Sequence, residues 1–223
     1  MAEKERIVVV PGEEIGEPGL KAGTGAYRKD EKIFAAQLGI RDVRAGYVNV
    51  VPLAGKYIPR TGDSVIGVVI EIGPSNWLVE INSPYPAPLH VSEVPWNVEF
   101  GDTQRYLNVG DAILAKVLMV DETKRVQVTM KDHGLRKLTG GQIVEITHSK
   151  VPRVIGKGGS MIAMLKEGTK CRIFVGQNGR IWIDGDLDNI LLAMRAIRKI
   201  EEAAQQYGLT EEVKAMLQLG ERR

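Results

Sequence analysis

The chain has 223 residues, of which 43% are apolar, 26% charged and 5% aromatic. This composition is typical of globular domains and excludes a disordered or low-complexity protein. A single cysteine, Cys171, excludes an intrachain disulfide framework and a thiolate metal cluster, and it favours a reducing compartment. The net charge of +2 is too small to indicate a nucleic-acid partner, so only its distribution along the chain can do so.

The beginning of the chain gives no sign of membrane targeting. Residues 1–6 are mostly charged or small, and the apolar run Ile7–Val10 is far shorter than the roughly 20 residues of a membrane span. We therefore expect a cytoplasmic protein without a membrane anchor.

Residues 1–56 are rich in glycine and contain short β-branched runs. This pattern predicts an N-terminal β-rich domain of short strands and tight turns. So short a segment buries little apolar surface, so it would gain stability by packing on a partner. The side chains expected to dock there are those of Val8, Val9, Val10 and Phe34.

Residues 57–134 contain five strand-like runs separated by Gly, Pro, Asn or Asp, which predicts a five-stranded barrel of the OB type. The runs are Ser64–Ile72, Trp77–Asn82, Pro88–Val91, Asp111–Val120 and Arg125–Met130. The connection between residues 84 and 106 is long enough to carry function, but a solvated excursion explains it equally well.

Residues 135–207 predict an α+β domain, and residues 208–223 a helical tail. A strand over 142–147, a glycine-rich turn, a short helix, two strands joined by Asn178-Gly179 and a long helix from Leu187 to Tyr207 follow one another. Asp186 or Asp188 is expected to cap the long helix. Asp184, Asp186 and Asp188 alternate here, and helix capping with a solvated turn explains them better than a metal site does.

The sharpest motif is residues 154–161, Val-Ile-Gly-Lys-Gly-Gly-Ser-Met, an apolar pair followed by Gly-x-x-Gly and a helix start. This context resembles the signature of KH domains, which clamp about four nucleotides of RNA at such a loop. Gly156, Gly158 and Gly159 would let phosphates approach the main chain, the next helix start offers free N–H groups, and Lys157 adds a counter-charge. An isolated loop of this kind is more often an ordinary turn.

Basic residues concentrate around this motif. Seven of them lie between Thr147 and Ile183 against one acid, Glu167, and the nearest to the loop are Lys150 and Arg153. A charge run is usually a solvated face, but one centred on a glycine loop favours RNA. Ile155, beside the loop, completes the expected contact set. A Walker-type nucleotide loop needs a different glycine spacing.

The predicted barrel resembles the ribosomal S-one RNA-binding module. The resemblance rests on Gly62-Asp63, on residues 89–93 (Leu-His-Val-Ser-Glu), and on Asp121 with Arg125. It implies that His90, Asp121 and Arg125 lie on the RNA face, although a structural role for His90 is equally expected. The two aromatic positions of the family fall here on Ser75 and Leu78, which puts base stacking in doubt. Trp77 is expected to pack in the core or at an interface.

The order of parts resembles the RNA-binding cap subunits of the archaeal exosome, the ribosomal-RNA-processing protein four family. The resemblance implies a multidomain fold, mainly β and then α+β, with no catalytic residues, cofactor or metal of its own. It implies single-stranded RNA as ligand, and partners that are copies of the chain in a trimeric cap and a hexameric ring of phosphorolytic exoribonuclease subunits.

Two alternatives belong to other classes. A transcription-elongation factor of the Nus type also carries an S-one module before KH, but a single Gly-x-x-Gly disfavours it. The second alternative is a nuclease that holds a metal with acidic residues of the barrel. The three histidines of the chain are scattered and give this alternative no local support.

Overall fold

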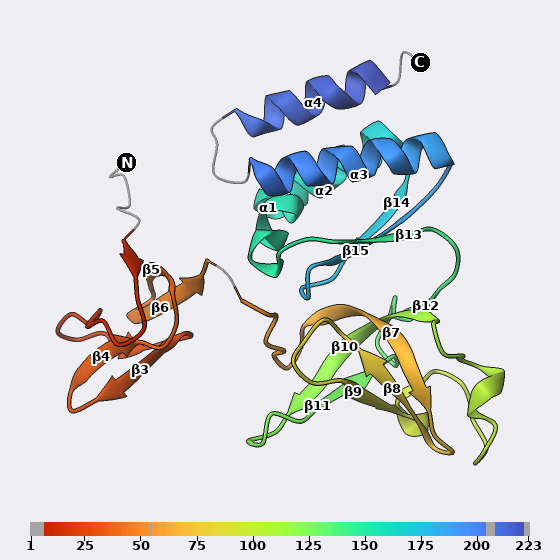
Figure 1. Ribbon diagram of the computed structural model, residues 1–223, viewed down its shortest axis with the longest axis horizontal. Helices are drawn as coiled ribbons and strands as arrows, with labels where there is room; N and C mark the ends of the chain where they lie inside the picture. Colours follow the sequence, from red (N-terminus) through yellow and green to blue (C-terminus); the bar gives the residue numbers. More distant parts are fainter. Residues whose placement is uncertain (1–6, 54, 204–207, 221–223) are drawn as a thin grey trace. The chain divides into compact units, whose positions relative to one another are not determined.

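The computed structural model describes residues 7–53, 55–203 and 208–220, the last three of these by backbone only. The chain divides into two compact units, residues 1–55 and residues 56–223 (Figure 1). The first unit is all β, and the second joins a β-barrel to an α+β region. The fold class predicted from the sequence is therefore confirmed.

The first unit is built from short strands. Four form a sheet in the order β1-β5-β6-β2, and β3 pairs with β4 in a hairpin. The strands are β1 (Val8–Val9), β2 (Lys21–Ala22), β3 (Ala26–Lys29), β4 (Lys32–Ala35), β5 (Gly39–Arg44) and β6 (Tyr47–Pro52). A core of six buried side chains holds the unit together: Val9, Ile15, Ile33, Ala35, Val48 and Val50. So small a core gives modest stability, as the glycine-rich sequence suggests.

The second unit begins with a closed barrel. Five strands follow the order β11-β9-β8-β7-β10, and pairing of β10 with β11 closes them. They are β7 (Ser64–Ile72), β8 (Asn76–Glu80), β9 (Ala87–His90), β10 (Ala112–Val120) and β11 (Val126–Thr129), close to the predicted runs. A sixth strand, β12 (Arg136–Leu138), pairs with β10, and the turns η1 (Val91–Glu93) and η2 (Thr103–Arg105) interrupt the connection from β9 to β10.

Trp77 is in the barrel core, as the sequence favours. Its side chain is fully buried, and its indole N–H donates to the carbonyl oxygen of Leu107 at 3.3 Å. Trp77 therefore cannot stack on a base without leaving the core.

The α+β region that follows has a sheet in the order β13-β15-β14, with helices packed on one of its faces. Its elements are β13 (Gln142–Glu145), η3 (His148–Lys150), α1 (Val151–Ile155), η4 (Lys157–Gly159), α2 (Ser160–Thr169), β14 (Arg172–Val175), β15 (Arg180–Asp184), α3 (Leu187–Glu202) and α4 (Leu209–Gly220).

Two details of the helices differ from expectation. The long helix α3 ends at Glu202 rather than at Tyr207, and residues 204–207 lie outside the described residues. Asp186 precedes the first turn of α3, but its side chain makes no capping hydrogen bond. Asp188 lies in the first turn, where a negative charge suits the helix dipole.

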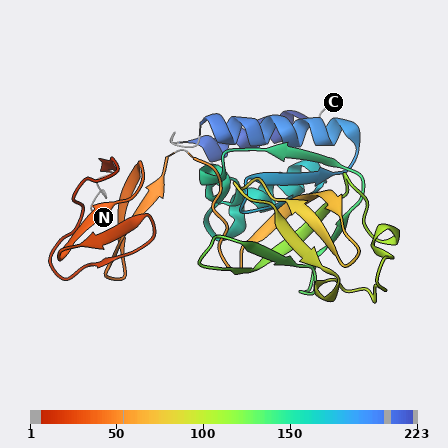
Figure 2. The ribbon, with the colours of Figure 1, turned by 60° about the horizontal axis from the view of Figure 1, so that its bottom comes forward.

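A buried hairpin turn joins the α+β region to the barrel. The turn between β14 and β15 places Asn178 against β7 and β8, where the residue is fully buried. Its side-chain NH2 donates to the carbonyl oxygens of Ile66 (2.8 Å) and Ile81 (2.9 Å), and its side-chain oxygen accepts from the Ile66 amide at 3.3 Å. Figure 2 shows the sheet of this region between the helices and the barrel.

An arginine and an apolar cluster strengthen the same joint. Arg180, only 8% exposed, donates to the carbonyl oxygen of Glu80 at 3.0 Å and pairs with the carboxylates of Glu80 and Glu145. A separate apolar cluster spans the two modules and consists of Ile66, Leu114, Leu138 and Trp182. The barrel and the α+β region therefore form one body.

The expectation of a single Gly-x-x-Gly turn is wrong. Gly176 and Gly179, which flank the buried turn, have the same spacing. A Cβ at Gly176 would lie 2.9 Å from the Ile66 amide nitrogen, and one at Gly179 would lie 2.3 Å from the Ile146 carbonyl oxygen. The backbone of this loop is therefore packed against protein, and only the Gln177 side chain of the turn is exposed.

Asn178→Ala should lower the free energy of unfolding by about 2–4 kcal/mol, because it leaves the buried amide and carbonyl groups of β7 and β8 without partners. Urea unfolding measures the effect. Gln177→Ala is the matched control, since its side chain is exposed in the same turn. Equal stabilities for the two variants would contradict the role given to Asn178.

Candidate nucleic-acid interface

The Gly156–Gly159 loop links α1 to α2, and its backbone conformation favours glycine. Gly156, Gly158 and Gly159 have φ angles of 75°, 61° and 81°, a left-handed region that other residues rarely adopt. A Cβ at Gly156 would also lie 2.7 Å from the Met161 amide nitrogen. The sharp reversal that starts α2 so close to the end of α1 therefore depends on these glycines.

The loop leaves the start of α2 open. No side chain caps this ten-residue helix, and nothing lies within 4 Å of a Cβ built at Gly158. The Gly156, Gly159 and Ser160 amides already donate to backbone carbonyl oxygens, so the attraction for an anion such as a phosphate comes mainly from the positive end of the α2 dipole. Lys157 is exposed in the loop itself, so its charge is available to the same anion.

The other predicted loop residues lie along or beside α1, whose five residues span only about 7–8 Å. Lys150 is half-exposed directly before the helix, and Arg153 is half-buried in its middle. Ile155, the last helical residue, packs partly against the core. The structure therefore brings Lys150, Arg153 and Lys157 to one end of the domain, with Ile155 as apolar support.

Two of the seven basic residues counted in this region serve other purposes. Arg180 is buried in the joint with the barrel, and Arg172 pairs with Asp184 across the sheet. The excess of positive charge near the loop is therefore smaller than the sequence suggests.

Glu201 anchors the segment that leads into α1. Its carboxylate accepts hydrogen bonds from the Thr147 amide (2.7 Å), the Thr147 hydroxyl (3.0 Å) and Arg198 (2.9 Å). Burial raises the pKa of Glu201, but the bonds from Thr147 and Arg198 outweigh it, so the pKa lies below its usual range. Glu201 thus fixes the backbone directly before η3 and Lys150.

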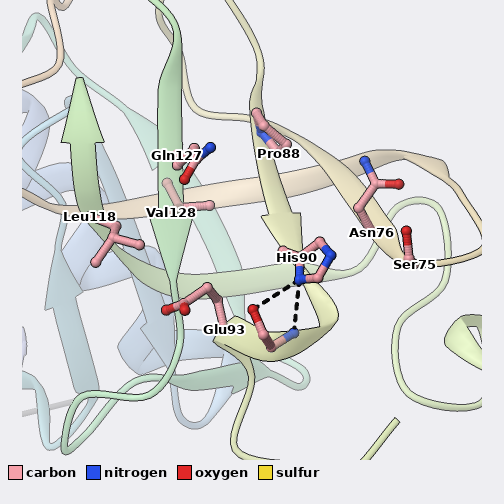
Figure 3. Close-up of a pocket in the computed structure, with 9 residues that line it drawn as sticks. Ser75, Asn76, Pro88, His90, Glu93, Leu118, Gln127 and Val128 are labelled. Atoms are coloured by element: carbon pink, nitrogen blue, oxygen red, sulfur yellow. Dashed lines mark hydrogen bonds between the residues drawn. The ribbon is translucent and has the colours of Figure 1, made fainter. Parts of the chain in front are cut away.

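The barrel carries a hollow of about 450 Å³ on its surface (Figure 3). Strands β8, β9 and β11 contribute most of its walls. The lining residues are Ser75, Asn76, Pro88, His90, Ser92, Glu93, Leu118, Gln127 and Val128. No Phe, Tyr or Trp lines the hollow, so it offers hydroxyl, amide and imidazole groups where the S-one family stacks bases on aromatic rings.

His90 combines the two roles weighed for it. Its ring Nδ1 accepts from the Ser92 amide at 3.1 Å and lies 2.8 Å from the Ser92 hydroxyl, so the side chain caps η1. Figure 3 shows His90 between Asn76 and Glu93 at the hollow. Because Nδ1 is the acceptor, the neutral ring carries its proton on Nε2, where it can donate to a ligand.

Asp121 closes the hairpin between β10 and β11. Its Oδ1 accepts from the Thr123 hydroxyl (2.7 Å) and the Arg125 amide (2.8 Å), and these bonds lower the pKa of Asp121. Arg125 is exposed, and it lies two residues before Gln127, which lines the hollow. Arg125 lies directly before β11, so it is a charged residue of this hairpin near the strand that lines the hollow.

Sequence reasoning missed Asn76, Ser92 and Gln127 of the hollow. Strand alternation places Asn76 outward beside the buried Trp77, but alternation alone does not show that three outward residues meet. Among the described residues, no three His, Cys, Asp or Glu side chains gather into a metal site. No described helix is long and apolar enough to cross a membrane.

Comparison with known proteins connects these observations. Residues 141–188 match a family model described as KH domain, and residues 56–117 match one described as RRP4, S1 domain. Exosome complex component Rrp4 of Methanosarcina barkeri is 50% identical over 209 residues, which cover 94% of this chain and 80% of that protein. The chain belongs to the Rrp4 family.

Other members of the Rrp4 family agree. Exosome complex component Rrp4 of Thermoplasma acidophilum is 50% identical, and the match covers 94% of this chain and 89% of that protein. A crystal structure provisionally described as an exosome complex RNA-binding protein is 42% identical, with a TM-score of 0.69 over 75% of this chain and 98% of that chain. The two family models match this chain in the order predicted from the sequence, the S1 domain before the KH domain.

Lys157→Asp/Gly158→Asp should weaken binding of single-stranded RNA by at least tenfold, because it places negative charge at the anion site without touching the core. Gly158 is a suitable position, since a Cβ there has open space and aspartate tolerates its φ of 61°. Lys157→Asn/Gly158→Asn is the control for shape. Fluorescence anisotropy measures both, and unchanged affinity in the aspartate variant would remove the loop from the interface.

Glu201→Gln should lower the free energy of unfolding by about 1 kcal/mol at pH 7. A carboxylate with a lowered pKa stabilises the fold above its unfolded pKa, and this contribution is lost as pH falls through the folded value. The difference between the two proteins should therefore shrink below about pH 4. Urea unfolding at pH 7 and pH 3 tests this, and an equal difference at both would show that charge is not responsible.

Proposed function

We propose that the chain is a non-catalytic RNA-binding subunit of the exosome, which caps a ribonuclease ring and recruits single-stranded RNA for 3′-to-5′ degradation and processing. The open Gly156–Gly159 loop at the uncapped start of α2 carries the proposal, because it is an anion site with basic residues around it. The names of the relatives as exosome components support the choice of complex.

Two surfaces divide the work on RNA in this proposal. The loop, with Lys150, Arg153 and Lys157, holds the phosphodiester backbone. The barrel hollow takes base edges through hydrogen bonds from groups such as the His90 Nε2–H. Arg125 supplies the charge beside it.

The first unit is proposed to dock on the ring through one face of its sheet. Val8 pairs with Ile40, and Ile40 pairs with Val51, so the three side chains form a row across β1, β5 and β6. Val8 and Val51 are 55% and 45% exposed, and Val10 is 53% exposed. An apolar row of this kind, open to solvent, fits a protein partner.

Two of the residues first assigned to docking lie outside this row. Val9 is 1% exposed because alternation turns it into the core of the first unit, so it cannot contact a partner. Phe34 is half-buried, and its ring stacks on Tyr27 at 5.7 Å between centroids. The proposed docking set is therefore Val8, Val10, Ile40 and Val51.

The proposal further includes a trimeric cap of this chain on a hexameric ring of phosphorolytic subunits, located in the cytoplasm. The barrel-first order of modules is shared with elongation factors of the Nus type, but 50% identity to Rrp4 proteins over 94% of the chain favours the exosome. Labelled RNA incubated with the pure chain and Mg²⁺ or phosphate separates the nuclease alternative, since cleavage would overturn the non-catalytic role.

Val8→Asp/Val51→Asp should abolish co-purification of the ribonuclease ring from native extract while RNA affinity stays within twofold, because the change affects only the docking face. The control Tyr85→Asp/Val109→Asp places the same charges on exposed apolar residues of the barrel loops. Mass spectrometry identifies what is retained. Ring subunits recovered with the docking variant, or RNA polymerase recovered with the wild type, would contradict the proposal.

A further inference from the structure

A cluster of cations surrounds one aromatic ring where the barrel meets the KH domain. The guanidinium carbon of Arg136, on β12, lies 4.9 Å from the centroid of the Phe174 ring, on β14. The ammonium nitrogen of Lys166, on α2, lies 5.8 Å from the same centroid. Three elements, two from the KH domain and one from the barrel, thus converge on this ring.

Both cations are available to a ligand. Arg136 and Lys166 are exposed, and neither forms an ion pair within the described part of the chain. The neighbouring Arg172 already neutralises Asp184. The cluster therefore carries two positive charges that no carboxylate within the described residues offsets.

The ring prepares Arg136 for recognition of a phosphate. Phe174 is half-buried, and its ring packs in a tilted arrangement against Trp182, with 5.7 Å between centroids. Because Trp182 is only 3% exposed, the domain joint fixes the position of the Phe174 ring. A guanidinium held over a fixed ring loses less freedom on binding, and its planar set of N–H donors matches phosphate oxygens.

The position of the cluster connects it to the glycine loop. Lys166 lies six residues along α2 from Ser160, which is about 9 Å of helix. Phe174 belongs to β14, whose only partner within the described residues is β15. RNA that is held at Gly156–Gly159 and continues along this side would reach Lys166 and then Arg136 on the barrel.

We propose that Arg136, Lys166 and Phe174 form a phosphate-binding site for single-stranded RNA that bridges the KH domain and the barrel. This inference rests on the proposed RNA-binding function and adds to it a contact that belongs to neither the glycine loop nor the barrel hollow. Phe174 is a positioning residue, whereas the two cations touch the RNA.

Arg136→Ala/Lys166→Ala should weaken binding of a single-stranded oligonucleotide long enough to span both modules by about tenfold. The log–log salt dependence should become shallower by about 0.7 for each lost phosphate contact. Arg195→Ala/Lys214→Ala removes the same charge from exposed positions of α3 and α4 and should change affinity less than twofold.

Two further variants test the ring. Phe174→Leu keeps an apolar side chain but removes the π face, and Arg136→Lys keeps the charge but not the planar donor set. Each should weaken binding about threefold, with unchanged urea unfolding for Arg136→Lys. If Phe174→Leu lowers the free energy of unfolding, Arg136→Lys alone tests whether the guanidinium over the ring contributes to RNA binding, because an exposed lysine does not disturb the core.

The outcomes separate this inference from the proposed function. In one outcome the wild-type chain binds RNA, the glycine-loop variant does not, and Arg136→Ala/Lys166→Ala matches its control in affinity and salt slope. The bridging site is then overturned, and the proposed function stands. If the wild-type chain fails to bind RNA, both fall. Cross-linking of thiouridine-labelled RNA to peptides that contain Arg136 or Lys166 is the positive result expected.

Discussion

The burial of one amide side chain, that of Asn178, is the constraint on which the RNA-binding unit depends. Asn178 satisfies backbone groups of Ile66 on β7 and of Ile81, directly after β8, while the strands on either side of it belong to the KH sheet. With Arg180 beside it, the turn converts two small modules into one body. The glycine loop, the hollow and the Arg136 cluster then keep fixed separations, so a strand of RNA that meets one of them finds the others already placed.

Two of the chain's three Gly-x-x-Gly segments, at residues 156–159 and 176–179, serve opposite purposes. At Gly156–Gly159, positive φ angles and missing side chains leave the main chain at the start of α2 uncovered, so that an anion can approach it. At Gly176–Gly179, the missing side chains let the turn approach the chain's own barrel. The flanking sequence distinguishes them, since an apolar pair and a helix start surround the first loop, whereas two strands flank the second. A loop between strands is a hairpin end, and this one is covered by protein.

Local sequence patterns were sufficient to predict the strands and helices but not the contacts between them. Alternating apolar residues predicted the barrel strands, and glycine spacing before a helix predicted the anion loop. The sequence around Val9, by contrast, does not show whether Val8 or Val9 faces the core. That depends on how β1 pairs with β5 and β6, where Val8 lies in a row with Ile40 and Val51. Arg180 was counted as a surface charge because its partners Glu80 and Glu145 lie far away in sequence. The stacking of Arg136 on Phe174 was equally invisible, since it joins strands of two modules.

The buried turn also bears on the chemical lifetime of the protein. Asn followed by Gly is the pair most prone to spontaneous deamidation, in which the glycine amide nitrogen attacks the asparagine side-chain carbonyl to form a succinimide. Here the Gly179 amide is engaged with the Gly176 carbonyl oxygen at 3.2 Å, and the Asn178 side chain is held by three hydrogen bonds, so the cyclic geometry is out of reach. Hydrolysis would replace an amide donor by a carboxylate facing the Ile66 and Ile81 carbonyl oxygens. The hydrogen bonds of Asn178 that join the two modules thus also protect Asn178 from deamidation.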